Sequence, residues 1–190
     1  MNKTSSFIAI VALAASALVS QAQDQSFEIT DLAPEVVKTP NYNFSLGPRN
    51  TRTDEQDWVQ VEVTFSAAPK FTDELTMKYY IAINKQLLTG EVTHINVPAG
   101  RGLRSVMYVP PRTVQRLMEG KNLTPNSFDN IAVQLLVKGQ LVAQKSWKGS
   151  PTDNWFQQVQ QIPNLVLNKS ETPFAPLYWD RYEMIRSGTR

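Results

Sequence analysis

The chain has 190 residues, a formal net charge of +2 and no cysteine. This length fits one domain, with or without an extension, and is sufficient to bury a real core. The absence of cysteine excludes both a disulfide-stapled scaffold and a thiolate zinc site, and the small, interleaved charge argues against a nucleic-acid partner.

The first 22 residues have the layout of a cleavable secretory signal. Lys3 supplies the positive start, residues 7–19 form an uncharged apolar stretch, and Ser20-Gln21-Ala22 presents small residues to a peptidase. A retained membrane anchor or a buried helix is the alternative, but the apolar stretch is too short to cross a bilayer comfortably. We expect export to the periplasm, outer membrane or cell surface of a Gram-negative-type bacterium. The mature chain would be peripheral to a membrane at most.

The mature chain, from Gln23 onward, begins with short segments that alternate between apolar and polar residues. Phe27–Thr30 and Glu35–Thr39 predict one edge strand interrupted by Pro34, and residues 41–57 predict a long loop. Strands with one buried face are predicted by their period of two at Trp58–Phe65, Leu75–Ile83, Glu91–Val97 and Leu103–Val109.

Residues 113–120 predict a short helix that stops at Gly120. Ile131–Lys138 and Leu141–Trp147 then alternate across a tight turn at Gly139, which predicts a hairpin. About seven strands with regularly spaced turn signals predict an immunoglobulin-like antiparallel β-sandwich over residues 23–150, with one short helical crossover. A barrel of similar strand number is the alternative.

Residues 151–190 do not show this regular spacing of strands and turns, and they are rich in aromatic side chains. Disordered tails are poor in such residues. We therefore expect an aromatic-rich extension that packs on the sandwich, with a short helix at Asp180–Ser187.

No residue pattern indicates catalysis. His94 is the only histidine, and it lacks both a Gly-x-Ser-x-Gly elbow and the further ligands that zinc requires, so we expect a solvated histidine on a strand. The acidic clusters at residues 54–57 and 73–74 precede strands, where acids are ordinary turn formers, and they lack the spacing of a calcium loop. The expectation is a protein that is not an enzyme and uses no cofactor and no metal.

Four side chains form the expected interaction surface: Arg101, Arg104, Tyr80 and Trp155. The two arginines, with Arg112 and Arg116 nearby in sequence, would face an anionic glycan or lipopolysaccharide; a solvated loop and helix face is the alternative. Tyr80 belongs to the outer face of its strand, in a cross-strand pair or an interface. Trp155 would join Phe156, Trp179 and Tyr182 in a sugar-stacking or protein-binding patch, or pack the extension onto the sandwich.

The strands Trp58–Phe65 and Leu75–Ile83, the closing residues Thr172–Tyr182 and the signal resemble a small verrucomicrobial protein family. These are Akkermansia-type immunoglobulin-like outer-membrane proteins encoded with a type IV pilus-like gene cluster. The resemblance implies an outer-membrane or surface location, a role in pilus assembly, secretion or host contact, and no catalytic residues.

The residue patterns and the resemblance together predict a non-enzymatic cell-envelope protein that binds envelope or pilus proteins. Exposed strand edges and loop faces would provide the contacts. A glycan-binding surface adhesin is the alternative, and an envelope hydrolase is a third hypothesis.

Overall fold

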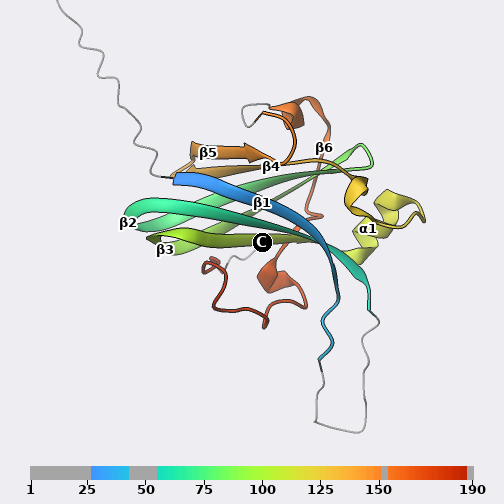
Figure 1. The fold of residues 1–190 in the computed structure, drawn as a ribbon, viewed down its shortest axis with the longest axis horizontal. Coiled ribbons are helices and arrows are strands. Elements are labelled where there is room, and N and C mark those ends of the chain that lie inside the picture. The colour runs from blue at the N-terminus through green and yellow to red at the C-terminus, as the bar shows by residue number, and fades with distance from the viewer. Residues whose placement is uncertain (1–26, 43–54, 151–153, 188–190) are drawn as a thin grey trace, which may run out of the picture.

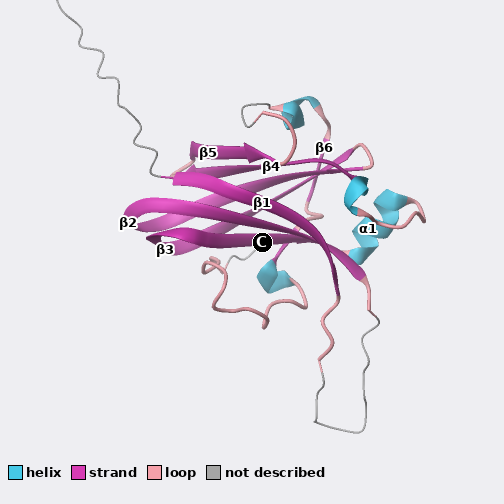
Figure 2. Cartoon of the chain, in the orientation of Figure 1, coloured by secondary structure: helices cyan, strands magenta, loops and turns pink. Residues whose placement is uncertain are grey.

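A computed structural model describes residues 27–42, 55–150 and 154–187. The predicted signal peptide and most of the predicted loop at 41–57 lie outside these residues. Seven strands form one mostly antiparallel sheet with the order β5-β4-β2-β3-β6, in which β1 also pairs with β2 and β7 with β3 (Figures 1 and 2). The predicted mainly β fold of about seven strands is confirmed.

Two long strands, β2 (Asp57–Ile83) and β3 (Gln86–Val109), form a hairpin that organises the whole sheet. The sequence predicted four separate strands here, and this was wrong because the chain stays extended between them. The pairing of β2 with β3 is irregular between Phe65 and Phe71, opposite Pro98 and Gly100. Irregular pairing of this kind tolerates proline and lets a strand bend without ending.

The bend folds the hairpin over, so that its two halves form facing layers. His94 and Ser105 both belong to β3, and in a straight strand they would lie about 36 Å apart. Instead the His94 Nε2 atom lies 2.7 Å from the Ser105 Oγ atom, across the core. The apolar faces predicted for the two halves of β2 meet in one buried cluster, which includes Val61, Val63, Met77 and Ile81.

The remaining long strands extend the two layers. The edge strand β1 (Phe27–Lys38) pairs with the first half of β2, with a register shift between Ile29 and Asp31. The strands β4 (Phe128–Val137) and β5 (Gln140–Ser146) pair beyond the second half of β2. The predicted hairpin turn is confirmed, since Lys138 and Gly139 both have the positive φ that such a turn requires.

The helix α1 (Pro111–Met118) packs its apolar side against one end of the layers (Figure 2). It starts two residues before the predicted helix because Pro111 suits the first helical position, and Glu119 ends it in a left-handed conformation. A 3-10 turn (Pro125–Ser127) then leads into β4. No helix of the described residues has the length and apolar character that crossing a membrane requires.

The C-terminal segment, residues 154–187, packs on both layers, as predicted. It contains the 3-10 turns Trp155–Gln158 and Lys169–Glu171 and the short strands β6 (Gln161–Pro163) and β7 (Leu167–Asn168). Its first part lies over one layer and its last part over the other (Figure 1). The predicted helix at Asp180–Ser187 is wrong: these residues follow the edge of β3 instead, with a bridge between His94 and Ile185.

Candidate functional site

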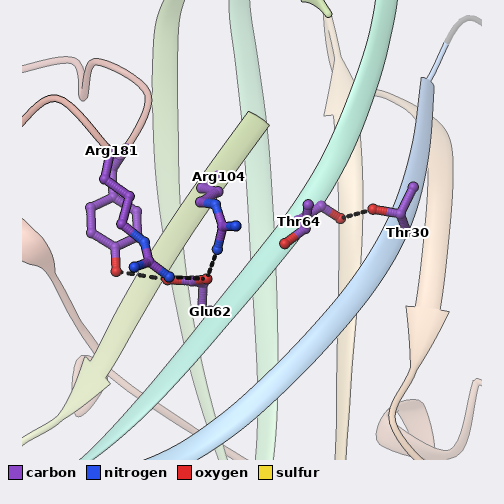
Figure 3. A network of polar contacts seen from close by, with 6 residues as sticks. Thr30, Glu62, Thr64, Arg104 and Arg181 are labelled. Carbon is purple, nitrogen blue, oxygen red and sulfur yellow. Dashed lines mark hydrogen bonds and ion pairs between the residues drawn. The ribbon is translucent and has the colours of Figure 1, made fainter. Parts of the chain in front are cut away.

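A buried carboxylate on the outer face of β2 joins the C-terminal segment to the sheet. Glu62 accepts hydrogen bonds from Arg104 on β3, from Arg181 Nη2 at 2.9 Å and from the Tyr182 hydroxyl at 2.8 Å. Figure 3 shows Arg104 and Arg181 converging on Glu62 from different elements. Alternation along β2 directs Glu62 away from the core, and the C-terminal segment covers it, so that only 8% of the residue is exposed.

The charge of Glu62 is compensated by its partners. Burial alone would raise the pKa of Glu62, but the hydrogen bonds from Arg181 and Tyr182 and the positive charges of Arg181 and Arg104 outweigh it and lower the pKa. Burial and the neighbouring Glu62 carboxylate raise the pKa of Tyr182. Glu62 therefore stays ionised and holds the C-terminal segment by charge-assisted hydrogen bonds.

The neighbouring stretch 174–182, here called the aromatic turn, is anchored at both ends. At its start, the Phe174 ring stacks on Tyr108 with centroids 4.6 Å apart and meets Trp58 edge-on at 5.5 Å. At its end, Arg181 and Tyr182 bind Glu62. Successive backbone hydrogen bonds shape the residues between them, from Leu177 N to Phe174 O and from Arg181 N to Tyr178 O.

The tip of the aromatic turn presents two large side chains to solvent. Trp179 is 81% exposed and Tyr178 is 62% exposed. Tyr178 has a φ of 50°, a left-handed conformation that a tyrosine rarely adopts without support from its surroundings. The anchored ends supply that support, so the backbone that carries the two exposed aromatic side chains is held at both ends of the turn.

His94 is buried in the core, and the predicted solvated histidine is wrong. The alternation of buried and exposed residues in β3 changes at Asn96, whose φ is 53°, so that Val92 and His94 before it and Val97 after it are all buried. The Tyr79 hydroxyl donates to Ser105 Oγ at 2.8 Å, and His94 Nε2 lies 2.7 Å from the same oxygen. Because Nδ1 faces the Glu183 carbonyl at 3.2 Å, Nδ1 carries the proton and Nε2 accepts from Ser105.

Burial lowers the pKa of His94 to about 4, although hydrogen bonds with the backbone of Glu183 and Met184 oppose this. The neutral ring is thus fully hydrogen-bonded inside the protein, and only 1% of the residue reaches solvent. Its hydrogen bonds join the two layers to the C-terminal segment.

Of the predicted surface arginines, Arg104 is directed to Glu62 and Arg101 is exposed in the bend of β3. Arg112 and Arg116 are exposed on α1, at the end of the layers. The four arginines therefore lie at separate places in the fold, and Arg104 binds Glu62.

The structure brings Tyr80 and Trp155 together around Phe156. The Tyr80 and Phe156 rings stack with centroids 4.0 Å apart, and Trp155 meets Phe156 edge-on at 5.7 Å. Tyr80 also donates a hydrogen bond to Gln134 Oε1 at 3.1 Å. These side chains pack the start of the C-terminal segment onto its layer, whereas Arg104 lies on the other layer.

The acidic clusters contribute ion pairs. Asp57 pairs with Lys38 at 2.6 Å and Glu74 pairs with Arg186 at 3.0 Å, whereas Asp54 lies outside the described residues. In the parts of the chain that the structure covers, histidine and acidic side chains nowhere gather in a group of three or more that could hold a metal ion.

Glu62 was not recognised as a distinct feature in the sequence, and Trp179 was predicted only as a member of one patch with Trp155, Phe156 and Tyr182. One signal was present for Glu62, because Trp58 shares its face of the strand and a large aromatic residue on an outward face requires a cover. No sequence signal separated the exposed Trp179 from the packed Trp155.

Comparisons with known proteins support the resemblance. A protein-family model matches residues 18–189. A crystal structure of a protein from Akkermansia muciniphila superimposes with a TM-score of 0.73 and 26% sequence identity, over 86% of this chain and 94% of that chain. Among curated proteins, no relative matches the chain. The chain belongs to the family that this model describes, the Akkermansia-type proteins that its strands and closing residues resemble.

Proposed function

We propose that this chain is an exported, non-enzymatic interaction protein of the cell envelope, which docks a partner protein through the aromatic turn. The observation that carries the proposal is the exposure of Trp179 and Tyr178 on a turn whose two ends are fixed to the sheet. Exposed tryptophan and tyrosine side chains dominate the binding energy of many protein interfaces. Anchoring the turn that carries them before binding reduces the entropy that association costs.

The partner that we propose is an envelope protein, in the first instance a component of a pilus-like assembly or secretion system. The predicted signal at residues 1–22 supports an envelope location, and the family resemblance favours a pilus-like partner. Binding accounts for the role of the turn without a chemical step, because the largest side chains that it exposes are the aromatic rings of Tyr178 and Trp179.

The experiment is crosslinking in the native envelope, followed by direct binding of the identified partner to the purified mature chain. We expect Trp179→Ala to lose the crosslinked partner and to weaken direct binding by roughly 30-fold or more, the effect of removing a central aromatic contact. The matched control is Phe71→Ala, since Phe71 is also an exposed aromatic residue, at the bend of β2. If both variants keep the partner, or both lose it equally, the aromatic turn is not the docking site.

A further inference from the structure

A half-enclosed cavity of about 920 Å³ lies between the sheet and the C-terminal segment. Its floor is the outer face of the layer formed by the second half of β2 and the first half of β3. Here Lys78 lies opposite Glu91, and Tyr80 lies opposite Thr89. The residues that connect β6 to β7 form one wall, which includes Asn164. The cavity shares no lining residue with the aromatic turn.

The cavity exists because the C-terminal segment leaves part of the β3 edge uncovered. The strand β6 pairs with Leu87–Thr89, and the next contact along this edge is the bridge of His94 to Ile185. Among the described residues, none pairs with 90–92 on this side. The volume of the cavity falls within the range of small-molecule sites, which is about 300 to 1,000 Å³.

The connection between β6 and β7 is held in place by Val166. A Cβ atom placed on Gly90 would lie 2.7 Å from Val166 Cβ, so the glycine leaves the space that this buried valine fills. The wall and the floor of the cavity are therefore parts of one packed structure, and the cavity is formed before any ligand enters.

The lining combines uncharged hydrogen-bonding groups with balanced charges. Side-chain amides and hydroxyls come from the floor and the wall, and the two cationic side chains are matched by two acidic ones: Lys78, Arg186, Glu91 and Glu171. A strongly anionic or cationic ligand would meet one pair of like charges. An apolar ligand would displace water from the charged groups of Lys78 and Glu91, which costs free energy.

We infer that this cavity is a binding site for a neutral saccharide. A sugar presents many hydroxyl groups, each of which donates and accepts, and so matches a lining of mixed amides, hydroxyls, carboxylates and ammonium groups. The apolar faces of sugar rings can contact Pro163 and Ile185 in the lining. This inference is independent of the proposed partner protein.

The test is an NMR titration of the purified mature chain with glucose, galactose, N-acetylglucosamine and lactose, beside a heparin-derived oligosaccharide. We expect at least one neutral sugar to shift the backbone amide signals of Gly90, Glu91 and Asn164. Glu91→Gln and Lys78→Met each remove one charge while keeping a side chain of similar length. Each should weaken binding by about tenfold, as expected for loss of a hydrogen bond to a charged group.

Glu28→Gln is the matched control, because it makes the same change on the exposed face of β1. Trp179→Ala is the second control and should leave sugar binding unchanged, so that this inference and the proposed docking function fail separately. Thermal unfolding of each variant checks that it is folded. The inference is overturned if none of the four neutral sugars binds, if only the heparin oligosaccharide binds, or if Glu28→Gln weakens binding as much as Glu91→Gln.

Discussion

Two buried titratable side chains of this protein are held in opposite protonation states. Glu62 remains charged because two arginines and a tyrosine compensate its burial, whereas His94 remains neutral because burial lowers its pKa more than its backbone hydrogen bonds raise it. Both side chains join the C-terminal segment to the sheet, Glu62 through Arg181 and Tyr182 and His94 through the Glu183 carbonyl. A change of pH therefore acts on the attachment of this segment.

His94 should make the folded protein less stable as the pH falls from about 6.5 to about 4. The pKa of His94 is about 4 in the folded state and close to 6.5 in the unfolded state, so that in this window only the unfolded chain binds the proton. The stabilising contribution is complete above pH 6.5 and is lost as the pH falls through the folded pKa. The loss amounts to about 3 kcal/mol in the free energy of unfolding, at about 1.4 kcal/mol per pH unit.

The measurement is urea denaturation between pH 7 and pH 5, compared with His94→Gln. This range lies above the pH at which Glu62 loses its contribution, because the pKa of Glu62 is lowered below its usual value. Burial raises the pKa of Glu183, which acts in the opposite direction, but the variant retains Glu183 and the comparison cancels its effect. An equal slope of stability against pH in both proteins would contradict the assignment of a neutral buried His94.

Among the strands, the sequence predicted the buried face correctly wherever apolar and polar residues alternate without interruption. The valines from Val59 to Val63 and the odd-numbered residues from Leu75 to Ile83 are all buried, as their period of two predicted. Alternation is a local signal, however, and it could not show that Pro69 and Gly100 lie within bent strands. The same limit explains His94, because the left-handed conformation of Asn96, with a φ of 53°, interrupts the alternation from which the buried face was predicted.

The contact between Gly90 in β3 and Val166 in the C-terminal segment could not be predicted from the sequence. Gly90→Ala should destabilise the protein by about 1 to 3 kcal/mol, because the new Cβ atom would lie 2.7 Å from Val166 Cβ and 2.9 Å from Met107 Cε. Val166→Gly removes the opposing Cβ atom, so that Gly90→Ala should cost less in that background. Urea denaturation of the two single variants, the double variant and the parent gives the coupling energy.

The control for this cycle is Gly100→Ala. A Cβ atom at Gly100 would lie no closer than 3.6 Å to Leu103 Cδ2, an ordinary contact, and we expect little change in stability. If Gly90→Ala is tolerated as well as Gly100→Ala, or if its cost is the same with and without Val166, the close packing of the C-terminal segment against β3 is wrong.

In the complete fold, the C-terminal segment completes the core of the folded sheet. Val166 fills space beside Gly90, Phe156 packs on Tyr80, and Phe174 stacks on Tyr108. The segment also follows the free edge of β3 through β6, Ile185 and β7. The two layers and this segment therefore depend on each other for the burial of their apolar surfaces.

Because of this dependence, residues 23–150 alone should not form a cooperatively folded protein. Removing a buried phenylalanine side chain costs about 3 to 5 kcal/mol, and the truncation removes both Phe156 and Phe174 together with Val166. Together these losses reach the net stability of a typical domain, about 5 to 15 kcal/mol. Thermal unfolding followed by circular dichroism should show no sharp transition, and a hydrophobic dye should bind the exposed faces.

Trp179→Ala in the full mature chain should keep its transition temperature, since that side chain is largely exposed. A sharp transition for residues 23–150 near the temperature of the full mature chain would show that the segment is a dispensable extension rather than part of the core.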